Sequence, residues 1–198
     1  MATNYSELKT EIADWTHRSN LTSFLDTFID YTEARMNRKL RMSEMETSTS
    51  IAVTTANLTL PTDFLETREV NVSGSPDTTL EFLTPHQFSI KQNDETGKPK
   101  YYSIQGDAMK LMPYGSYTIE LLYYKNITAL DSTNTSNFIL SDYPDMYLNG
   151  CLHFAYLYSR DADNAAMHAQ EFERLMNEAN KVSRARKFNG VPLRTTTA

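Results

Sequence analysis

Cysteine is nearly absent from this sequence of 198 residues, in which Cys151 is the single example. One cysteine can form neither an internal disulfide nor a cysteine-based metal site, so we expect it to be a small core residue. The four histidines lack metal-ligand spacing, and only six glycines are present. No glycine-rich phosphate loop, nucleophile elbow or zinc-binding His/Glu pattern occurs. The sequence therefore predicts no metal, no cofactor and no catalytic residue.

A signal peptide and long hydrophobic runs are also missing, so we expect an aqueous setting without membrane contact. Basic residues are outnumbered by acidic ones, and the net charge is -6. Extensive nucleic-acid binding needs a basic face, and the only basic cluster is at the C-terminal end, which limits such contact to a local one. The hydrophobic fraction of 40% is enough to bury a core in one large domain or in two small lobes.

The strongest helical signal lies between Ser141 and Phe188. Capping residues followed by Pro144 predict a helix start, because proline at the first helical position loses no hydrogen bond. The polar run 161–164 interrupts the apolar pattern and predicts the start of a second helix, with an apolar stripe along one side. Basic side chains collect at the end of this helix, where the helix dipole favours them: Lys181, Arg184, Arg186 and Lys187.

The last residues, 188–198, lack periodicity and have too little apolar content to fold alone. Asn189-Gly190 predicts the helix end. We expect this tail to become ordered on a partner through apolar anchors and charges, with a frayed terminus as the alternative. The predicted docking residues are Arg184, Arg186, Lys187, Phe188, Val191, Leu193 and Arg194.

Two further helices are predicted near the N-terminus, from Tyr5 to Trp15 and from about Thr22 to Met42, on the spacing of their apolar residues. The second helix carries a charged row opposite its apolar face. Such a row is usually solvated, but in an oligomer it could meet an acidic neighbour. The row consists of Glu33, Arg35, Arg38, Lys39 and Arg41.

From about residue 44 the composition shifts to Thr, Ser and Val in short alternating runs, which predicts strands. We expect a short hairpin from 49–54 and 57–60, strands over 66–72 and 79–83, and a meander over 101–105, 108–112 and 116–125. Pro85 predicts the start of a short helix that runs through Ile90.

The predicted fold class is α+β: an antiparallel helical bundle from the N- and C-terminal helices, with an inserted β-rich lobe and an extended C-terminal tail. Helices at both ends around a central sheet imply that the terminal helices pack on each other. The predicted parts are the N-terminal helices of the bundle, 1–43, the inserted β-rich lobe, 44–130, the C-terminal helices of the bundle, 131–187, and the tail, 188–198.

Tyrosines concentrate in the predicted meander, at 101, 102, 114, 117, 123 and 124. Tyrosine suits a protein contact because its ring can be half-buried while its hydroxyl stays wet. Tyr117 and Tyr124 are the candidate contact residues. A sheet packed on both sides within one subunit accounts for the tyrosines equally well.

Several short segments of the sequence occur in a characteristic order and with characteristic spacing. They read DWTHRSNL over 14–21, EARMNRKLR over 33–41 and EME over 44–46, then LPTDFLE over 60–66, IQGD over 104–107, LLYY over 121–124 and DYPDMYL over 142–148. In this order they resemble the head-to-tail adaptor proteins of short-tailed bacteriophages. The resemblance covers the chain from about Tyr5 to Arg160.

The resemblance implies a structural virion protein, made in the bacterial host cytoplasm, and not an enzyme. In this family about twelve copies form a ring below the portal protein. The ring extends the DNA channel, through which DNA passes without sequence-specific binding, and it offers a platform for tail nozzle and tail fibre proteins. The C-terminal segment docks on the portal. Candidate contacts with a neighbouring subunit or a tail protein are Arg35, Arg38, Arg41, Tyr117 and Tyr124.

Two other functions stay open at the level of the sequence. A virion-associated peptidoglycan-degrading enzyme would use a pair of acids, for which Asp161 with Asp163 is available. A β-rich tail-protein binding module would make its main contact through the tyrosine-rich meander.

Overall fold

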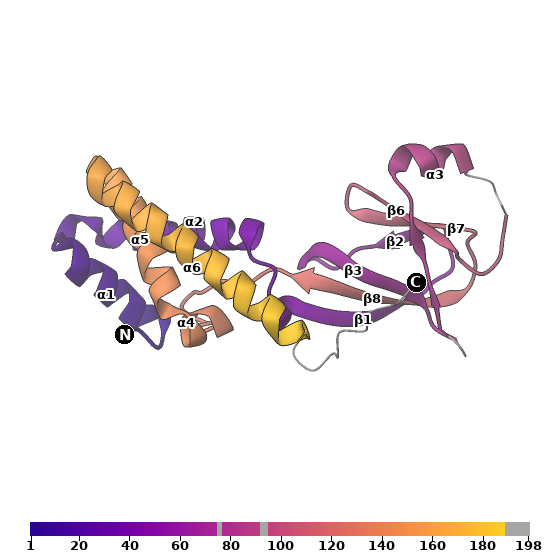
Figure 1. Ribbon diagram of the computed structural model, residues 1–198, viewed down its shortest axis with the longest axis horizontal. Helices are drawn as coiled ribbons and strands as arrows, with labels where there is room; N and C mark the ends of the chain where they lie inside the picture. Colours follow the sequence, from indigo (N-terminus) through magenta and orange to yellow (C-terminus); the bar gives the residue numbers. More distant parts are fainter. Residues whose placement is uncertain (75–76, 92–94, 189–198) are drawn as a thin grey trace, which may run out of the picture. The chain divides into compact units, whose positions relative to one another are not determined.

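A computed structural model of the protein describes residues 1–74, 77–91 and 95–188 (Figure 1). Within these ranges it is mixed α+β, with six α-helices and two β-sheets, so the predicted α+β class is confirmed. The chain divides into two compact units. The helical unit consists of residues 1–44 together with the described residues from Ile127 onward, and the β unit lies within Met45–Asn126. The bundle topology stays a prediction, and the tail 189–198 lies outside the described residues.

The N-terminal helices are α1 (Tyr5–Thr16) and α2 (Leu25–Lys39). Asn4 caps α1 because its side-chain oxygen accepts a hydrogen bond from the Glu7 N–H at 3.0 Å. A 3-10 helix over Ser19–Phe24 leads into α2. The predicted start of the second helix, near Thr22, falls in this 3-10 turn, so α2 begins later than predicted.

The C-terminal half contains α4 (Phe138–Asp142), α5 (Pro144–Tyr158) and α6 (Ala162–Phe188). Pro144 is the first residue of α5, as predicted, because proline fits the first helical position. The expected capping residues Ser141 and Asp142 belong to α4 instead, and Tyr143 precedes α5 without a side-chain capping hydrogen bond. Asp161 accepts hydrogen bonds from the N–H groups of Asn164 and Ala165 and so caps α6. The short α4 was not predicted, although the Asn137 side chain caps it through the Leu140 N–H.

Helix α5 is the centre of the helical unit, since it contacts α1, α2, α4 and α6 (Figure 1). This position explains why α5 is apolar on more than one face. Cys151 is fully buried in it, as predicted for a small core residue. A Cβ on Gly150 would overlap the Thr32 methyl group and lie 3.1 Å from Phe172, so a glycine at this position lets α2 and α6 come close to α5.

The β unit contains two four-stranded sheets, with strand orders β1-β8-β3-β4 and β2-β7-β6-β5. Apolar residues from both sheets form one core cluster, which includes Val53, Leu58, Val70, Met109 and Ile119. The two sheets therefore pack face to face. The first sheet contains β1 (Glu46–Val53), β3 (Phe64–Val72), β4 (Thr78–Thr79) and β8 (Tyr117–Lys125). The second contains β2 (Asn57–Thr59), β5 (Glu81–Phe82), β6 (Tyr101–Gln105) and β7 (Ala108–Met112).

The strand positions are close to those predicted, but two pairings are wrong. The predicted hairpin of 49–54 with 57–60 does not form, because β1 pairs with β8 and β2 pairs with β7. The predicted meander contains only the β6–β7 hairpin, because β8 belongs to the other sheet. The predicted strand 79–83 divides at the buried Leu80 into β4 and β5, one in each sheet. In each case, two segments that are adjacent in the sequence belong to different sheets of the sandwich. Their inward-facing side chains are buried between the two sheets.

The short helix predicted to begin at Pro85 and run through Ile90 is present as α3 (Pro85–Lys91). Its Phe88 side chain is buried with Leu83 and Met112 in a small cluster of its own. Thr84 precedes the helix as a cap, because its hydroxyl accepts a hydrogen bond from the Gln87 N–H at 3.4 Å.

Candidate interaction surfaces

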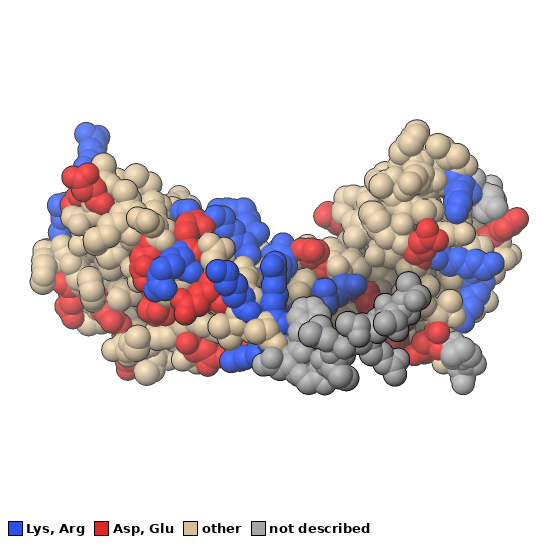
Figure 2. All heavy atoms as spheres, viewed as in Figure 1, with Lys and Arg blue, Asp and Glu red and all other residues tan. Residues whose placement is uncertain are grey.

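Basic side chains gather over the C-terminal ends of α2 and α6 (Figure 2). The sequence predicts both groups, but it does not predict that the two helix ends come together. They do so because the segment after α2 is hydrogen-bonded to α6: the Ser43 N–H donates to Ser183 Oγ at 2.7 Å. The basic residues of this region are Arg35, Arg38, Lys39, Arg41, Lys181, Arg184, Arg186 and Lys187.

Arg35 and Lys39 bind to the same carboxylate of α6. Arg35 Nη2 lies 2.5 Å from Glu173 Oε1, and Lys39 Nζ lies 2.5 Å from Glu173 Oε2. Partial burial raises the pKa of Glu173, but the hydrogen bonds from Lys39 and Arg35 outweigh it and hold the pKa below its usual value. Arg35 also lies over the Phe172 ring, with its Cζ 5.7 Å from the ring centroid. Arg35 therefore joins α2 to α6 within one chain.

The other two arginines of the charged row differ from each other. Arg41 caps the end of α2, since its Nη1 donates to the carbonyl oxygens of Asn37 at 3.0 Å and Leu40 at 2.5 Å. Its backbone N–H donates to Asn180 of α6 at 2.9 Å. Arg38 is exposed, and its side chain forms no ion pair with any residue in the described ranges. Among the three predicted contact arginines, Arg38 is the one whose charge is fully available to another molecule.

Glu33 was placed in the exposed charged row, and the structure shows that this is wrong. Its side chain is 4% exposed, and its Oε1 accepts hydrogen bonds from the Tyr147 hydroxyl at 2.8 Å and the Leu130 N–H at 2.9 Å. Burial raises the pKa of this carboxyl to about 7, although the two hydrogen bonds act in the opposite direction. The network joins α2 to α5 and to the segment that returns from the β unit. Its only sequence signal is that Glu33 shares a helix face with Ile29 and Met36.

The end of α6 is anchored up to Arg186, whose Nη1 lies 2.7 Å from Glu44 Oε1. Arg184 is exposed and Lys187 is half-buried. The structure therefore places three of the predicted docking residues, Arg184, Arg186 and Lys187, on the last turns of α6. The Phe188 side chain and the residues Val191, Leu193 and Arg194 lie outside the described part, so their docking role stays a prediction.

The two candidate tyrosines of the β unit differ in exposure. Tyr117 is half-buried against the sandwich core, and Tyr124 is only 6% exposed. The Arg68 guanidinium lies over the Tyr124 ring, 5.6 Å from its centroid. Tyr117 therefore offers more surface to another protein than Tyr124, and the predicted contact of either residue with a partner stays a prediction.

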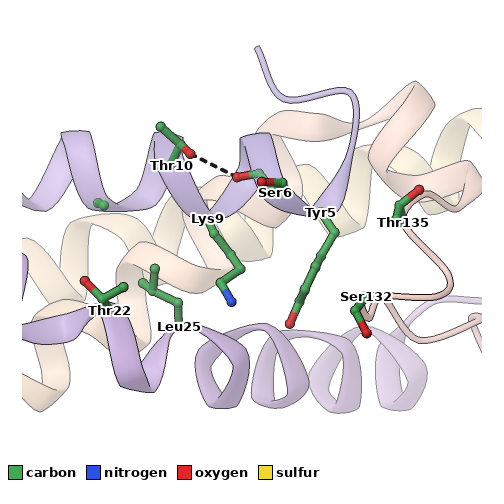
Figure 3. Close-up of a pocket in the computed structure, with 9 residues that line it drawn as sticks. Tyr5, Ser6, Lys9, Thr10, Thr22, Leu25, Ser132 and Thr135 are labelled. Carbon is green, nitrogen blue, oxygen red and sulfur yellow. Dashed lines mark hydrogen bonds between the residues drawn. The ribbon is translucent and has the colours of Figure 1, made fainter.

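A hollow of about 600 Å³ lies beside α1, lined by residues of α1, the 3-10 helix and the segment 132–135 (Figure 3). The side chains of Tyr5 and Lys9 both point across it towards α2 (Figure 3). There the Asp26 carboxylate accepts a hydrogen bond from the Tyr5 hydroxyl at 2.6 Å and lies 2.5 Å from Lys9 Nζ. The hydrogen bonds from Lys9 and Tyr5 hold the pKa of Asp26 below its usual range. These groups connect α1 to α2, which leaves neither Lys9 nor Tyr5 free as a nucleophile.

Two groups that could have supported an enzyme have structural roles: Asp161 caps α6, and Cys151 is a buried core residue. Hydrogen bonds from Asn164 hold the pKa of Asp161 below its usual value, whereas a general acid needs a raised pKa. Burial raises the pKa of the Cys151 thiol to about 12, which makes it a poor nucleophile. Across residues 1–74, 77–91 and 95–188, no group of three or more His, Cys, Asp or Glu side chains could hold a metal ion.

The surface of the helical unit exposes aromatic side chains that the sequence pattern assigns to no function. Phe24, Tyr31 and Tyr158 are 38%, 54% and 52% exposed. The ring centroids of Phe24 and Tyr158 lie 4.7 Å apart, and those of Tyr31 and Phe154 lie 5.4 Å apart. Trp15, which is 53% exposed, lies on α1. Exposed aromatic groups of this kind are typical of protein contacts.

None of the helices in the described part of the chain is both long and apolar enough for a bilayer span. No curated protein matches the sequence. The family model for the SU10 adaptor protein matches residues 3–196, nearly the whole chain. The chain therefore belongs to the SU10 adaptor protein family, and its resemblance to phage head-to-tail adaptors is confirmed.

Proposed function

We propose that this chain is the head-to-tail adaptor of a bacteriophage virion, and that copies of it form a ring below the portal protein. The ring extends the DNA channel and gives tail nozzle and tail fibre proteins a surface to attach to. The residues 188–198 dock on the portal. Membership of the adaptor family supports a structural role in the virion, and the ring, the portal and the tail proteins are inferred from the resemblance.

The anchored, basic end of α6 is the observation that supports docking of the tail. Ser183 and Arg186 hold the last turns of α6 against the segment that follows α2. The chain therefore leaves the helical unit from a fixed point, which lowers the entropy lost when the following residues bind. The exposed Arg184 adds positive charge beside this point. An acidic segment of a portal protein would be attracted to it.

The net charge of -6 suits a wall along which DNA passes. Repulsion between like charges keeps a polyanion from binding to such a surface. We expect the basic region at the ends of α2 and α6 to contact other proteins and not the DNA. We expect no sequence-specific binding of DNA.

The docking role is tested by deleting residues 188–198 and measuring binding to purified portal protein by light scattering. We expect binding to be lost, while the circular dichroism spectrum and the thermal midpoint stay unchanged, because the contacts of Ser183 and Arg186 remain. The matched control deletes only 195–198 and keeps Val191, Leu193 and Arg194, so it should still bind. Unchanged portal binding by the longer deletion would refute the docking role.

A further inference from the structure

Two outer helix faces in the helical unit carry complementary groups. The first, the α1 surface, consists of Glu7, Glu11, Asp14 and Trp15. The second, the α2 surface, consists of Tyr31 and Arg38. We propose that the α1 surface of one copy packs antiparallel against the α2 surface of a second copy, and that this contact repeats around the ring. The inference rests on the proposed ring and assigns the residues that build it.

The two surfaces cannot meet within one chain, because each points away from the contact between α1 and α2. In that contact Lys9 of α1 pairs with Asp26 of α2. By helical geometry, the residues of the α1 surface lie roughly 120–160° around the helix from Lys9, and those of the α2 surface lie roughly 120–160° from Asp26. A contact between two different surfaces on different sides of a subunit is heterologous. Contacts of this kind produce rings when the rotation closes.

The charges on the two surfaces are opposite. Glu7, Glu11 and Asp14 line a hollow of about 400 Å³ on α1, together with Met1, Ala2 and Thr10. Glu7 and Glu11 accept hydrogen bonds from the N–H groups of Thr3 and Ala2, each at 2.8 Å, which leaves their negative charge in place. Arg38 is exposed and forms no ion pair within the described residues. The α2 surface therefore brings a cation with no ion-pair partner among the described residues, and the α1 surface brings a hollow lined by three carboxylates.

The spacing of the groups also matches. Each surface has an aromatic end and a charged end: Trp15 follows the acids on α1, whereas Tyr31 precedes Arg38 on α2. At 1.5 Å per residue, Tyr31 and Arg38 are about 10 Å apart along the helix. When antiparallel helices place Trp15 level with Tyr31, Arg38 comes level with position 8 of α1, between Glu7 and Glu11. One alignment therefore satisfies both the aromatic and the charged contact.

The aromatic contact would supply most of the binding energy. Trp15 and Tyr31 are 53% and 54% exposed, and large aromatic side chains are typical of the centre of protein interfaces. Phe154 lies beside Tyr31, with 5.4 Å between the ring centroids, and extends the apolar area on the side of the α2 surface. The ion pairs at the rim contribute less affinity and select the alignment.

Cysteine cross-linking tests the contact directly, because the native Cys151 is fully buried and does not react. A Glu7→Cys variant and an Arg38→Cys variant of the full chain are mixed at high concentration and treated with a short thiol cross-linker. We expect the mixture to give roughly ten-fold more cross-linked dimer than a control mixture, since bound copies hold the two thiols at a high effective concentration. The control replaces the Glu7→Cys variant by Asn177→Cys, which is exposed on α6. A chain that carries both Glu7→Cys and Arg38→Cys should give a ladder of oligomers.

Equal yields in the two mixtures would overturn the proposal. Charge reversal gives an independent measurement by sedimentation velocity. Arg38→Glu alone and Glu7→Arg alone should each weaken self-association about five-fold at low salt, and an equal mixture of the two variants should recover part of it. A weakening that the mixture does not reverse would also contradict the proposal. Portal binding is measured separately, so failure of this contact and failure of the adaptor function give different results.

Discussion

Glu33 and Tyr147 form a hydrogen bond inside the helical unit, with 2.8 Å between the tyrosine hydroxyl and the carboxylate oxygen. Their side chains are 4% and 0% exposed. No basic side chain among the described residues forms an ion pair with Glu33, and the carboxyl is largely shielded from water. Desolvation therefore dominates and raises the pKa of Glu33 to about 7, with smaller contributions from the negative charges of Asp30 and Asp131.

The free energy of unfolding should fall as the pH rises from about 5 to about 8. The folded pKa of about 7 lies above the usual value of 4.5, so between these values the folded protein keeps a proton that the unfolded chain has lost. The contribution of Glu33 is complete below 4.5 and disappears as the pH rises through about 7. Its size is about 3 kcal/mol. Chemical denaturation of the wild type and of Glu33→Gln, at several pH values, checks this.

Glutamine is the appropriate replacement because it keeps an acceptor oxygen for the Tyr147 hydroxyl and the Leu130 N–H. We expect the Glu33→Gln variant to lose the pH dependence between 5 and 8 while keeping the stability that the wild type has at low pH. The same fall of stability with pH in both proteins would show that another group is responsible.

Gly150→Ala should destabilise the helical unit by about 1–3 kcal/mol, because the added methyl group overlaps the Thr32 side chain and comes within 3.1 Å of Phe172. Glycine to alanine at an open helix position has the opposite sign, with a gain of about 1 kcal/mol. The thermal midpoint measures the effect. Thr32→Ser removes the overlapping methyl group and keeps the hydroxyl, so the double variant should recover part of the loss. An increase in stability for Gly150→Ala alone would be incompatible with this packing.

Glu173→Gln should lower stability by about 0.5–1 kcal/mol at low salt, because it removes ion pairs with both Arg35 and Lys39. The loss should shrink as salt screens the charges. Glu178→Gln on the same helix is the matched control, since the ion pair of Glu178 is with the exposed Arg174 of its own helix and not with α2. Denaturation at two salt concentrations compares the variants. Equal effects of the two substitutions would mean that Glu173 does not stabilise the contact between α2 and α6.

Tyr124→Ala should destabilise the β unit by about 3 kcal/mol, because the ring is 6% exposed and its removal leaves a cavity. Tyr117→Ala should cost less, since this ring is half-buried. Thermal unfolding of both variants separates core packing from partner binding. If Tyr117→Ala folds normally but loses recruitment of a tail protein, the predicted contact at Tyr117 is supported; unchanged recruitment would count against it.

Local signals explain what could be predicted of this fold. Pro144 marks the start of α5, because proline fits the first helical position, and Asp161 caps the start of α6; both signals act within a few residues. Strand pairing was not predictable in the same way. β1 pairs with β8 across most of the β unit, and nothing in the segment around residues 54–56 signals that the chain moves from one sheet to the other. Turn residues favour hairpins, so the nearest strand was the natural but wrong partner.

The candidate surfaces show the same difference. The basic end of α6 was predictable, since charge and helix dipole act locally. The burial of Glu33 was not, because it depends on Tyr147 and Leu130, which are distant in sequence. The outward positions of Trp15 and Tyr31 also depend on which faces α5 covers. Periodicity shows that a helix has an apolar face, but it does not show which aromatic side chains stay outside the core.

The pairing of β1 with β8 has a consequence for the order in which the chain folds. Glu46 lies opposite Tyr124 in the register of these strands, so the β unit brings together the two points where the chain enters and leaves it. This unit can fold once residue 126 has left the ribosome, before α5 and α6 have fully emerged. Closing a long loop costs entropy. Folding of the β unit closes the loop between the N-terminal and the C-terminal helices, so this entropy is already lost before those helices pack on each other. When α5 emerges, the folded β unit therefore connects it to α1 and α2 over a much shorter effective loop than the unfolded chain would.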